Sequence, residues 1–421
     1  MPHHTITPKK NLQTWYVVVA LGLGIVVGEW LNLRFGGPEL ASKDPALLQI
    51  TEILAVLTDM FMRMIKMIIA PLVFSTLVVG MSKMGEGQTV GRVGLKAMLW
   101  FFSASMISLL LGMLLVNYFV PGENIHLPLP QIGAETGVSA NKSMLSGFVA
   151  HLFPTSIADA MARNEVLQIV VFSIFFGVAC AHLGELAQPM IKSLDSLGHI
   201  MLKMTGYVMH FAPLAVFAAI AAVIAKQGLG VLKTYGGFIA EFYFGLLLLW
   251  IVLGLVGFLC LGNKVFSLLR HIREPALLAF GTASSEAAYP KLLQQLERFG
   301  CEEKIAGFVL PLGYSFNLDG SMMYMTFAVL FIAQAYGIAM PLDQQLLMML
   351  VLLFTSKGVA GVPRASLVVI SATLAMFQIP EAGLLLLLGV DQLLDMGRSA
   401  TNVWGNSLAA AVVSRWERSL N

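Results

Sequence analysis

The chain has few charged residues. Asp, Glu, Lys and Arg make up 12% of its 421 residues, whereas soluble domains carry about 25%. The formal net charge is only +2 and the sequence has no long basic run, so the composition does not indicate a partner that is a nucleic acid. Hydrophobic residues instead reach 57%, and the mean hydropathy is +0.79. This composition is typical of a chain whose main solvent is lipid, and it argues against two or three soluble domains.

Cysteine is also scarce. Cys180, Cys260 and Cys301 form no CxxC pair and no spacing typical of metal ligands. We interpret them as small buried hydrophobic residues, and we expect neither a metal centre nor a disulfide framework.

The N-terminal region lacks a clear A-x-A-like cleavage site. Lys9 and Lys10 precede an apolar run from about residue 14 to residue 33, which is longer than the core of a signal peptide. We therefore predict that this run is the first transmembrane helix.

Apolar segments long enough to cross the roughly 30 Å hydrocarbon core recur along the chain. Two further apolar stretches are interrupted by polar residues, glycine and proline, and each is predicted to form a re-entrant hairpin of two short helices. The expected fold class is thus an all-α polytopic membrane protein in one integral unit, 1–421. The eight predicted transmembrane helices lie near residues 14–34, 49–82, 95–119, 146–182, 199–225, 236–262, 305–336 and 381–413, and the hairpins near 274–293 and 345–379.

The distribution of Lys and Arg predicts the orientation. Most of those outside the apolar segments fall on one side, and the positive-inside rule then places both termini in the cytoplasm. The 274–293 hairpin, interrupted at Gly281–Ser285 and Pro290, would enter from inside, and the 345–379 hairpin from outside. A hairpin followed by a spanning helix thus occurs twice in opposite senses, which is typical of an inverted-repeat transporter with a site near the midplane.

The last apolar segment carries a polar stripe. Asp391, Asp395, Arg398, Asn402 and Asn406 lie three or four residues apart, within a stripe roughly 80° wide on a helix. Each charge costs about 2.5–3.5 kcal/mol at the bilayer centre, so these groups must pair or face water. An ion-pair cluster that only fixes helix packing is the alternative, but the two amides extend the stripe beyond the needs of such a pair.

A second polar focus lies in the preceding segment. Gly313 and Gly320 bracket Asn317 and Asp319, and we expect this stretch to unwind and direct oxygen atoms toward a cation. The alternative is a kinked helix whose aspartate pairs with Lys or Arg. The tip of the first hairpin offers hydroxyl and N–H groups to a carboxylate, and the glycines of the second tip, 355–363, allow close backbone approach.

These motifs together resemble the dicarboxylate/amino acid:cation symporter family, which includes bacterial glutamate transporters. The resemblance rests on Thr282–Glu286, Asn317–Ser321, Gly358–Pro363 and Asp391–Asn402, and it covers nearly the whole chain. It implies a homotrimer in the bacterial inner membrane that takes up glutamate or aspartate with coupling cations and no other cofactor. It also implies a scaffold part, about 14–82 and 146–225, and a transport part, about 95–119 and 236–413, that slides like an elevator.

The resemblance assigns roles to individual residues. Arg398 would bind the side-chain carboxylate of the substrate through its planar fork, and Asp395 would pair with the α-ammonium group. The remaining substrate-binding positions would be Ser284, Ser285, Ser321, Val362, Ser399 and Asn402. The cation-binding or proton-coupling positions would be Gly313, Ser315, Asn317, Asp319, Ser356, Asp391, Asn402 and Asn406, with a sodium ion, where one binds, held at Gly313, Asn317, Asp319 and Asn402.

The sequence departs from the sodium-coupled members of that family. Asn406 stands in place of a carboxylate, and Phe101, Ala104 and Ser105 stand in place of an aromatic hydroxyl and a Thr-Ser pair. These losses weaken two sodium sites, so proton coupling is favoured and sodium coupling is the alternative. The proton carriers would be Asp319, Asp395 and Glu286.

Other functions fit the residues less well. Within the same family the alternative is uptake of C4-dicarboxylates such as succinate, fumarate or malate, for which Asp395 would have no ammonium to neutralise. An intramembrane aspartyl protease using Asp319 and Asp391 would be expected to show a GxGD run, and Arg398 would prevent a proton-sharing dyad. A channel would not need two hairpins of opposite sense. We therefore predict a transporter and no enzymatic activity.

Overall fold

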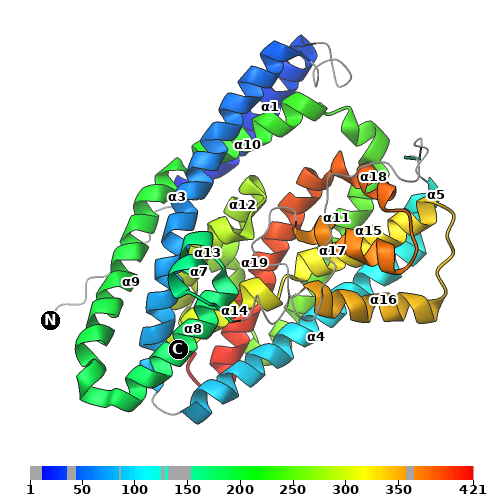
Figure 1. Cartoon of the computed structure of the whole chain (residues 1–421). Helices are drawn as coiled ribbons and strands as arrows, with labels where there is room; N and C mark the ends of the chain where they lie inside the picture. Colours follow the sequence, from blue (N-terminus) through cyan, green and yellow to red (C-terminus); the bar gives the residue numbers. More distant parts are fainter. Residues whose placement is uncertain are drawn as a thin grey trace.

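The computed structural model describes residues 12–35, 44–84, 87–124, 129–130, 153–356 and 365–420, and these are almost wholly helical. The predicted all-α class is confirmed (Figure 1). The first half comprises α1 (Leu12–Arg34), α3 (Pro45–Met84), α4 (Gly87–Phe119), α5 (Pro121–Asn124), α7 (Ile157–Arg163), α8 (Val166–Leu183), α9 (Gln188–Val208) and α10 (Ala212–Gln227). The second half comprises α11 (Val231–Leu261), α12 (Lys264–Thr282), α13 (Ser285–Phe299), α14 (Glu303–Phe316), α15 (Asp319–Ala335), α16 (Leu342–Thr355), α17 (Ala365–Met376), α18 (Leu384–Leu388) and α19 (Asp391–Trp416).

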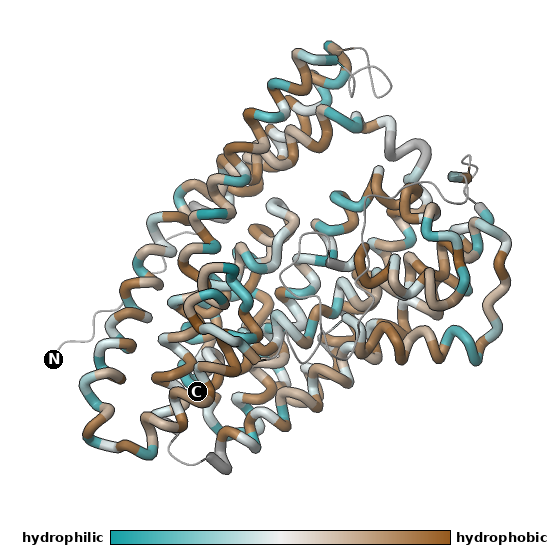
Figure 2. Tube along the Cα trace, viewed as in Figure 1, coloured by the Kyte–Doolittle hydropathy of each residue, from teal (hydrophilic) through white to brown (hydrophobic). Residues whose placement is uncertain are grey.

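Six stretches within the described ranges are long and apolar enough to cross a membrane. Helices α8 to α10 count together as one of these stretches, residues 166–227, and α19 is not among them. Hydrophobic residues recur along the helices, interspersed with polar ones (Figure 2). The predicted number of eight transmembrane helices therefore stays a prediction.

Three predicted helices are divided where no break was predicted, and the one predicted at 381–413 comprises the short α18 and the long α19. The segment predicted at 146–182 contains α7 and α8, because Asn164 adopts a left-handed conformation (φ 56°) that ends α7. The segment predicted at 199–225 passes from α9 through a 3-10 turn into α10, which has a proline in its first turn. These two breaks, at Asn164 and at the 3-10 turn, were not predicted because short polar or proline signals outweighed a continuous apolar composition, and residues 146–152 of the first segment lie outside the described residues.

The predicted break in 305–336 is smaller than expected. Only Asn317 and Leu318 lie between α14 and α15, and the bracketing glycines are helical. Gly313 leaves space for the Asn406 side chain, and a Cβ atom on Gly320 would lie 2.6 Å from the carbonyl oxygen of Arg398. The glycines therefore serve close approach to α19 rather than unwinding.

The first predicted hairpin forms a helix–turn–helix in which α12 and α13 pack against each other. Its turn, at Ala283 and Ser284, falls within the predicted interruption, and Ala283 is left-handed (φ 49°). The helices extend beyond the predicted 274–293, and Pro290 lies inside α13 without ending it. For the second hairpin, α16 and α17 are described, and the tip at 357–364 lies outside the described residues.

Figure 1 shows α1, α3, α9 and α10 along one side of the molecule, and α4, α11 and α15–α17 along the other. Helices α1 and α10 cross closely, because Gly24 and Gly28 carry no side chain against α10. Near the end of this pair, Asn32 Nδ2 donates to the carbonyl oxygen of Ala225 at 2.9 Å. The assignment of these two sides to a scaffold and a moving part stays a prediction.

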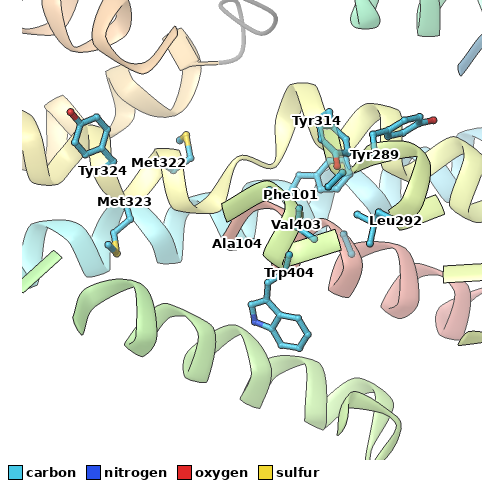
Figure 3. Packing of buried hydrophobic residues seen from close by; sticks show 14 of the residues in the cluster. Phe101, Ala104, Tyr289, Leu292, Tyr314, Met322, Met323, Tyr324, Val403 and Trp404 are labelled. Carbon is cyan, nitrogen blue, oxygen red and sulfur yellow. The ribbon is translucent and has the colours of Figure 1, made fainter. Parts of the chain in front are cut away.

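Aromatic packing fixes α19 against α11. The indole rings of Trp404 and Trp250 stack with centroids 5.6 Å apart, and Trp404 Nε1 donates to the carbonyl oxygen of Trp250. Trp250 Nε1 donates in turn to Thr401 Oγ1 at 2.9 Å. Figure 3 shows Trp404 and Val403 in the buried cluster with Phe101 and Ala104 of α4. Buried aromatic side chains contribute most to such packing, so the polar face of α19 is held in one orientation.

A charged clamp holds the far end of α19 against α4. The Arg92 guanidinium donates to both carboxylate oxygens of Glu417, and Lys96 Nζ lies 2.7 Å from Glu417 Oε1. The hydrogen bond from Arg92 holds the pKa of Glu417 below its ordinary value. Helix α19 is therefore anchored at its aromatic middle and at its C-terminal end.

Candidate substrate and cation site

The charged residues of the polar stripe meet at the start of α19. Arg398 is 2% exposed, and its Nη2 atom lies 3.1 Å from Asp391 Oδ1 and 3.0 Å from Asp395 Oδ1. The side chain of Asp395 is 35% exposed, whereas that of Asp391 is 6% exposed. Asp391 therefore holds the guanidinium from inside, and Asp395 is the accessible acid of the cluster.

Tyr324 of α15 completes this cluster. Its ring centroid lies 3.9 Å from Arg398 Cζ, and its hydroxyl donates to Asp391 Oδ1 at 3.0 Å. A cation over an aromatic face is stabilised by the ring quadrupole. Sequence reasoning missed this residue, although Tyr324 follows Ser321 by three positions and so shares its helix face.

Arg398 keeps unused hydrogen-bonding capacity. Its Nε and Nη1 atoms are buried and have no hydrogen-bond partner among the described residues. Unsatisfied buried donors on a charged group are costly, and a carboxylate is the group that guanidinium pairs with best. The cluster is thus arranged to receive a carboxylate, beside an exposed acid that would favour a positive group.

Asn402 connects α19 to the start of α15. Its Oδ1 atom accepts from the backbone N–H of Gly320 at 2.9 Å and of Ser321 at 3.4 Å, and its Nδ2 donates to Ser321 Oγ at 3.3 Å. The amide oxygen thereby satisfies N–H groups that have no partner within the helix. The structure brings these predicted residues together, and Ser399, 4% exposed, lies on the same helix.

A second cluster of polar side chains, named here the Asp319 pocket, surrounds Asp319, which is fully buried. Its Oδ2 atom accepts from Asn317 Nδ2 at 2.9 Å, and its Oδ1 atom accepts from Ser108 Oγ at 3.4 Å. Asn317 Nδ2 also lies 3.3 Å from Asn406 Oδ1. Predicted residues from two helices therefore meet here, and they are joined by Ser108 of α4.

This pocket contains oxygen atoms suited to a hard cation. Asn317 Oδ1 and Ser315 Oγ are buried without a hydrogen-bond partner among the described residues. Asn317 Oδ1 and the Asp319 carboxylate are oxygen donors of the kind that sodium prefers. Of the predicted cation residues, Gly313, Asn317, Asp319 and Asn406 lie together here, whereas Asp391 belongs to the Arg398 cluster.

The residues of α4 that depart from the sodium-coupled pattern lie on the same helix as Ser108. Phe101 and Ala104 are buried, and neither has a side-chain oxygen to offer a cation (Figure 3). Ser105 Oγ lies 3.5 Å from the carbonyl oxygen of Phe316. Sequence reasoning missed Ser108, although it lies one turn beyond Ala104 on the same face of the helix.

The predicted residues of the two hairpins contact other partners. Ser284 Oγ accepts from the N–H of Ala287 at 3.3 Å and caps α13, and the carbonyl oxygen of Ser285 accepts from the hydroxyl of Tyr314 at 2.9 Å. Ser356 Oγ donates to the carbonyl oxygen of Leu353. Val362 lies outside the described residues. Contact of these residues with substrate or cation stays a prediction.

A buried, paired guanidinium and a buried carboxylate inside an apolar helical bundle are typical of membrane transporters. The family model described as "Sodium:dicarboxylate symporter family" matches residues 14–416, and the chain belongs to this family of membrane symporters. The predicted family membership is thereby confirmed, and the chain is a multi-pass membrane protein.

The chain is similar over most of its length to relatives that are named for two different substrate classes. The chain is 38% identical to a C4-dicarboxylate transport protein of Citrifermentans bemidjiense over 98% of this chain and 92% of that protein. It is 37% identical to a proton/sodium-glutamate symport protein of Geobacillus stearothermophilus over 97% of this chain and 95% of that protein. A C4-dicarboxylate transport protein of Laribacter hongkongensis is 39% identical over 87% of this chain and 84% of that protein. Overall similarity therefore does not separate the two substrate classes.

The hydroxyl of Tyr324 gives a first prediction. In Tyr324→Phe the ring still covers Arg398 but no longer donates to Asp391, so the guanidinium is less firmly positioned. A hydrogen bond to a charged group contributes about 1.5–3 kcal/mol, so we expect KM for the substrate to rise about tenfold. The measurement is substrate uptake into proteoliposomes. Tyr336→Phe, which removes a hydroxyl bonded to the Pro130 carbonyl, is the matched control. An unchanged KM in Tyr324→Phe would contradict the positioning role.

Proposed function

We propose that this symporter takes up an acidic amino acid, glutamate or aspartate, together with protons. The observation that carries the proposal is the pairing of Arg398 with an acid, Asp395, that is partly exposed. Arg398 binds the side-chain carboxylate of the substrate, and Asp395 binds its α-ammonium group.

The charges of the cluster favour an amino acid. Asp391, Asp395 and Arg398 together carry one net negative charge when both acids are ionised. The ammonium group of an amino acid neutralises Asp395, whereas a second carboxylate in its place would be repelled. Opposite charges in a buried site stabilise each other, and like charges at that distance cost several kcal/mol.

A C4-dicarboxylate is the second candidate. The unpaired Nε and Nη1 atoms of Arg398 suit a carboxylate of either substrate. Two of the relatives named above are C4-dicarboxylate transport proteins, which supports this alternative. If a dicarboxylate binds, Asp395 must either be protonated or turn away from it.

Substitution of Asp395 separates the two candidates. We expect Asp395→Asn to lower kcat/KM for glutamate or aspartate about 10- to 100-fold, because a charge-assisted hydrogen bond to the ammonium group contributes about 1.5–3 kcal/mol. Uptake of succinate and fumarate should be low in the parent protein and should not fall further. Asp343→Asn, at an exposed position on α16, is the matched control. Strong succinate uptake by the parent protein that survives in Asp395→Asn would instead support the dicarboxylate.

The Asp319 pocket supports proton coupling. Its carboxylate is fully buried and accepts hydrogen bonds from the neutral donors Asn317 and Ser108. The neighbouring side chain is the amide of Asn406 rather than a second acid. We therefore assign the coupled proton to Asp319. Proton uptake at Asp319 would therefore accompany substrate binding.

Ion gradients test the coupling directly. We expect an inward proton gradient to drive accumulation of the substrate in sodium-free proteoliposomes with the membrane potential clamped. Accumulation that requires added sodium would contradict proton coupling. We expect Asn406→Asp to introduce a sodium dependence, because a second carboxylate would add a charged oxygen ligand beside Asp319. Asn117→Asp, at an exposed amide on α4 that pairs with Gln345, controls for the added charge.

We also propose the wider arrangement that the family resemblance implies. The α12–α19 part with α4 and α11 carries the site and moves against a scaffold containing α1, α3 and α7–α10. The protein forms a homotrimer with both termini in the cytoplasm. The clamp between α4 and Glu417 supports joint movement of α4 and α19, since it ties them together at one end.

A further inference from the structure

A cavity separate from the polar site lies between two groups of helices. Its volume is about 240 Å³, and the residues that line it are all apolar. Leu21 and Ile25 of α1 and Val223 of α10 line one wall, and Phe280 of α12 and Leu393 and Met396 of α19 line the other. The cavity therefore opens between the α1–α10 pair and the helices that carry the polar site.

Both walls are held in place by specific contacts. On the first wall, Glu29 Oε2 accepts from the backbone N–H of Leu229 at 2.8 Å, and Gly28 lets α1 approach α10. On the second wall, the hydroxyl of Tyr243 donates to the carbonyl oxygen of Leu393 at 2.6 Å. Gly281 of α12 packs against Val216 of α10. A Cβ atom on Gly281 would lie only 2.6 Å from Val216 Cγ1. The two walls of the cavity are therefore fixed by hydrogen bonds and close helix packing.

The lining restricts the chemistry of an occupant. An engineered apolar cavity of about 150 Å³ in another protein stays dry and binds benzene or xenon, and this cavity is larger. Leu, Ile, Val, Phe and Met side chains offer no partner to a charged or hydrogen-bonding group. An occupant must therefore be a hydrocarbon group.

The surroundings indicate where that hydrocarbon comes from. The face of α1 that points away from α10 exposes large apolar side chains, including Trp15, Leu23, Val26 and Trp30. In a membrane this face lies against lipid, so acyl chains are the apolar molecules at high concentration next to Leu21 and Ile25. We propose that the cavity is a binding site for one acyl chain of a membrane lipid, inserted between α1–α10 and α12–α19.

The position of this site brings the acyl chain next to the proposed transport machinery. Met396 follows Asp395 directly, and Phe280 lies three residues before the turn at Ala283. The bound chain therefore contacts both sides of the boundary between the two groups of helices. Binding of the chain does not depend on the identity of the transported substrate or ion.

Photolabelling tests the site. The full-length protein is reconstituted with phosphatidylcholine that carries a diazirine in the middle of one acyl chain, illuminated, digested and analysed by mass spectrometry. We expect adducts on peptides containing Val223, Phe280 and Met396. Filling the cavity from either helix, with Val223→Phe or Ile25→Phe, should reduce these adducts to background. Leu23→Phe, on the exposed face of α1, should leave them unchanged.

Three results would overturn the proposal. Adducts on the lining peptides could be absent although the exposed face of α1 is labelled, they could persist in both filled variants, or they could fall equally in Leu23→Phe. A diazirine-bearing free fatty acid is tested in parallel. Labelling by the free fatty acid but not by phosphatidylcholine would overturn the assignment to an acyl chain of a membrane phospholipid. Thermal unfolding of each variant in the same vesicles shows that it is folded. Because photolabelling does not require transport, the labelling result can be interpreted even if the proposed uptake function is wrong.

Discussion

Replacement of Arg398 by alanine is expected to abolish uptake of the acidic substrate. The guanidinium is buried, pairs with Asp391 and Asp395, and has two further donors without a partner among the described residues. Removing one partner of a buried ion pair costs about 3–5 kcal/mol, because the opposite charge is left buried alone. Since 1.4 kcal/mol corresponds to a factor of ten, we expect kcat/KM to fall by about 100-fold or more.

The measurement is uptake of labelled glutamate, aspartate and succinate into proteoliposomes. Arg415→Ala is the matched control, because Arg415 lies on the same helix and is exposed near its C-terminal end. Arg398→Lys tests whether charge alone suffices, since lysine lacks the planar fork that binds a carboxylate through two hydrogen bonds. Uptake by Arg398→Ala with an unchanged KM would remove this residue from the substrate site.

Replacement of Gly405 by alanine is expected to block coupling to the cation. A Cβ atom at this position would overlap Asp319 Oδ2 and lie 3.2 Å from Asn317 Nδ2. The carboxylate would have to leave its place in a pocket that is fully buried, and overpacking of this kind typically costs about 1–3 kcal/mol. We expect accumulation driven by an ion gradient to be lost, with a smaller effect on exchange of substrate at equal concentrations.

Gradient-driven accumulation and equilibrium exchange are measured on the same vesicles. Gly254→Ala is the matched control, because its added Cβ atom would lie 3.5 Å from the ring of Trp404, an ordinary contact distance. Thermal unfolding of both variants separates loss of coupling from loss of folding. Normal gradient-driven accumulation in Gly405→Ala would show that the position of Asp319 is not needed for coupling.

Several features of the site followed from local sequence alone. The spacing of Asp391, Asp395 and Arg398 predicted a common helix face, because an α-helix places residues three and four apart on the same side. The break near Asn317 and the turn near Ser284 were marked by polar residues and glycines in apolar segments. These properties depend on the periodicity and hydrogen bonding of short segments, so they can be predicted without the rest of the chain.

Helix boundaries were predicted less well. The divisions between α7 and α8 and between α9 and α10 were missed, as was the separate α18 before α19. Hydropathy measures whether a segment can be buried, and it does not record where the backbone changes direction. Two signals for these breaks were present in the sequence. They were an asparagine, Asn164, which adopts the left-handed conformation that ends α7, and the proline in the first turn of α10.

Composition and helical periodicity by themselves predicted an all-α membrane protein with a polar stripe on its last long helix, and the resemblance of its motifs to a known family implied a symporter. Only the tertiary structure placed Tyr324 over Arg398, brought Ser108 to Asp319 and showed that Gly405 leaves room for that carboxylate. It also created the apolar cavity between Ile25 and Met396. These contacts join residues that are far apart in the chain or on different helices. They depend on how helices pack side by side, which is decided by the shapes of many side chains together and not by the pattern of any one segment.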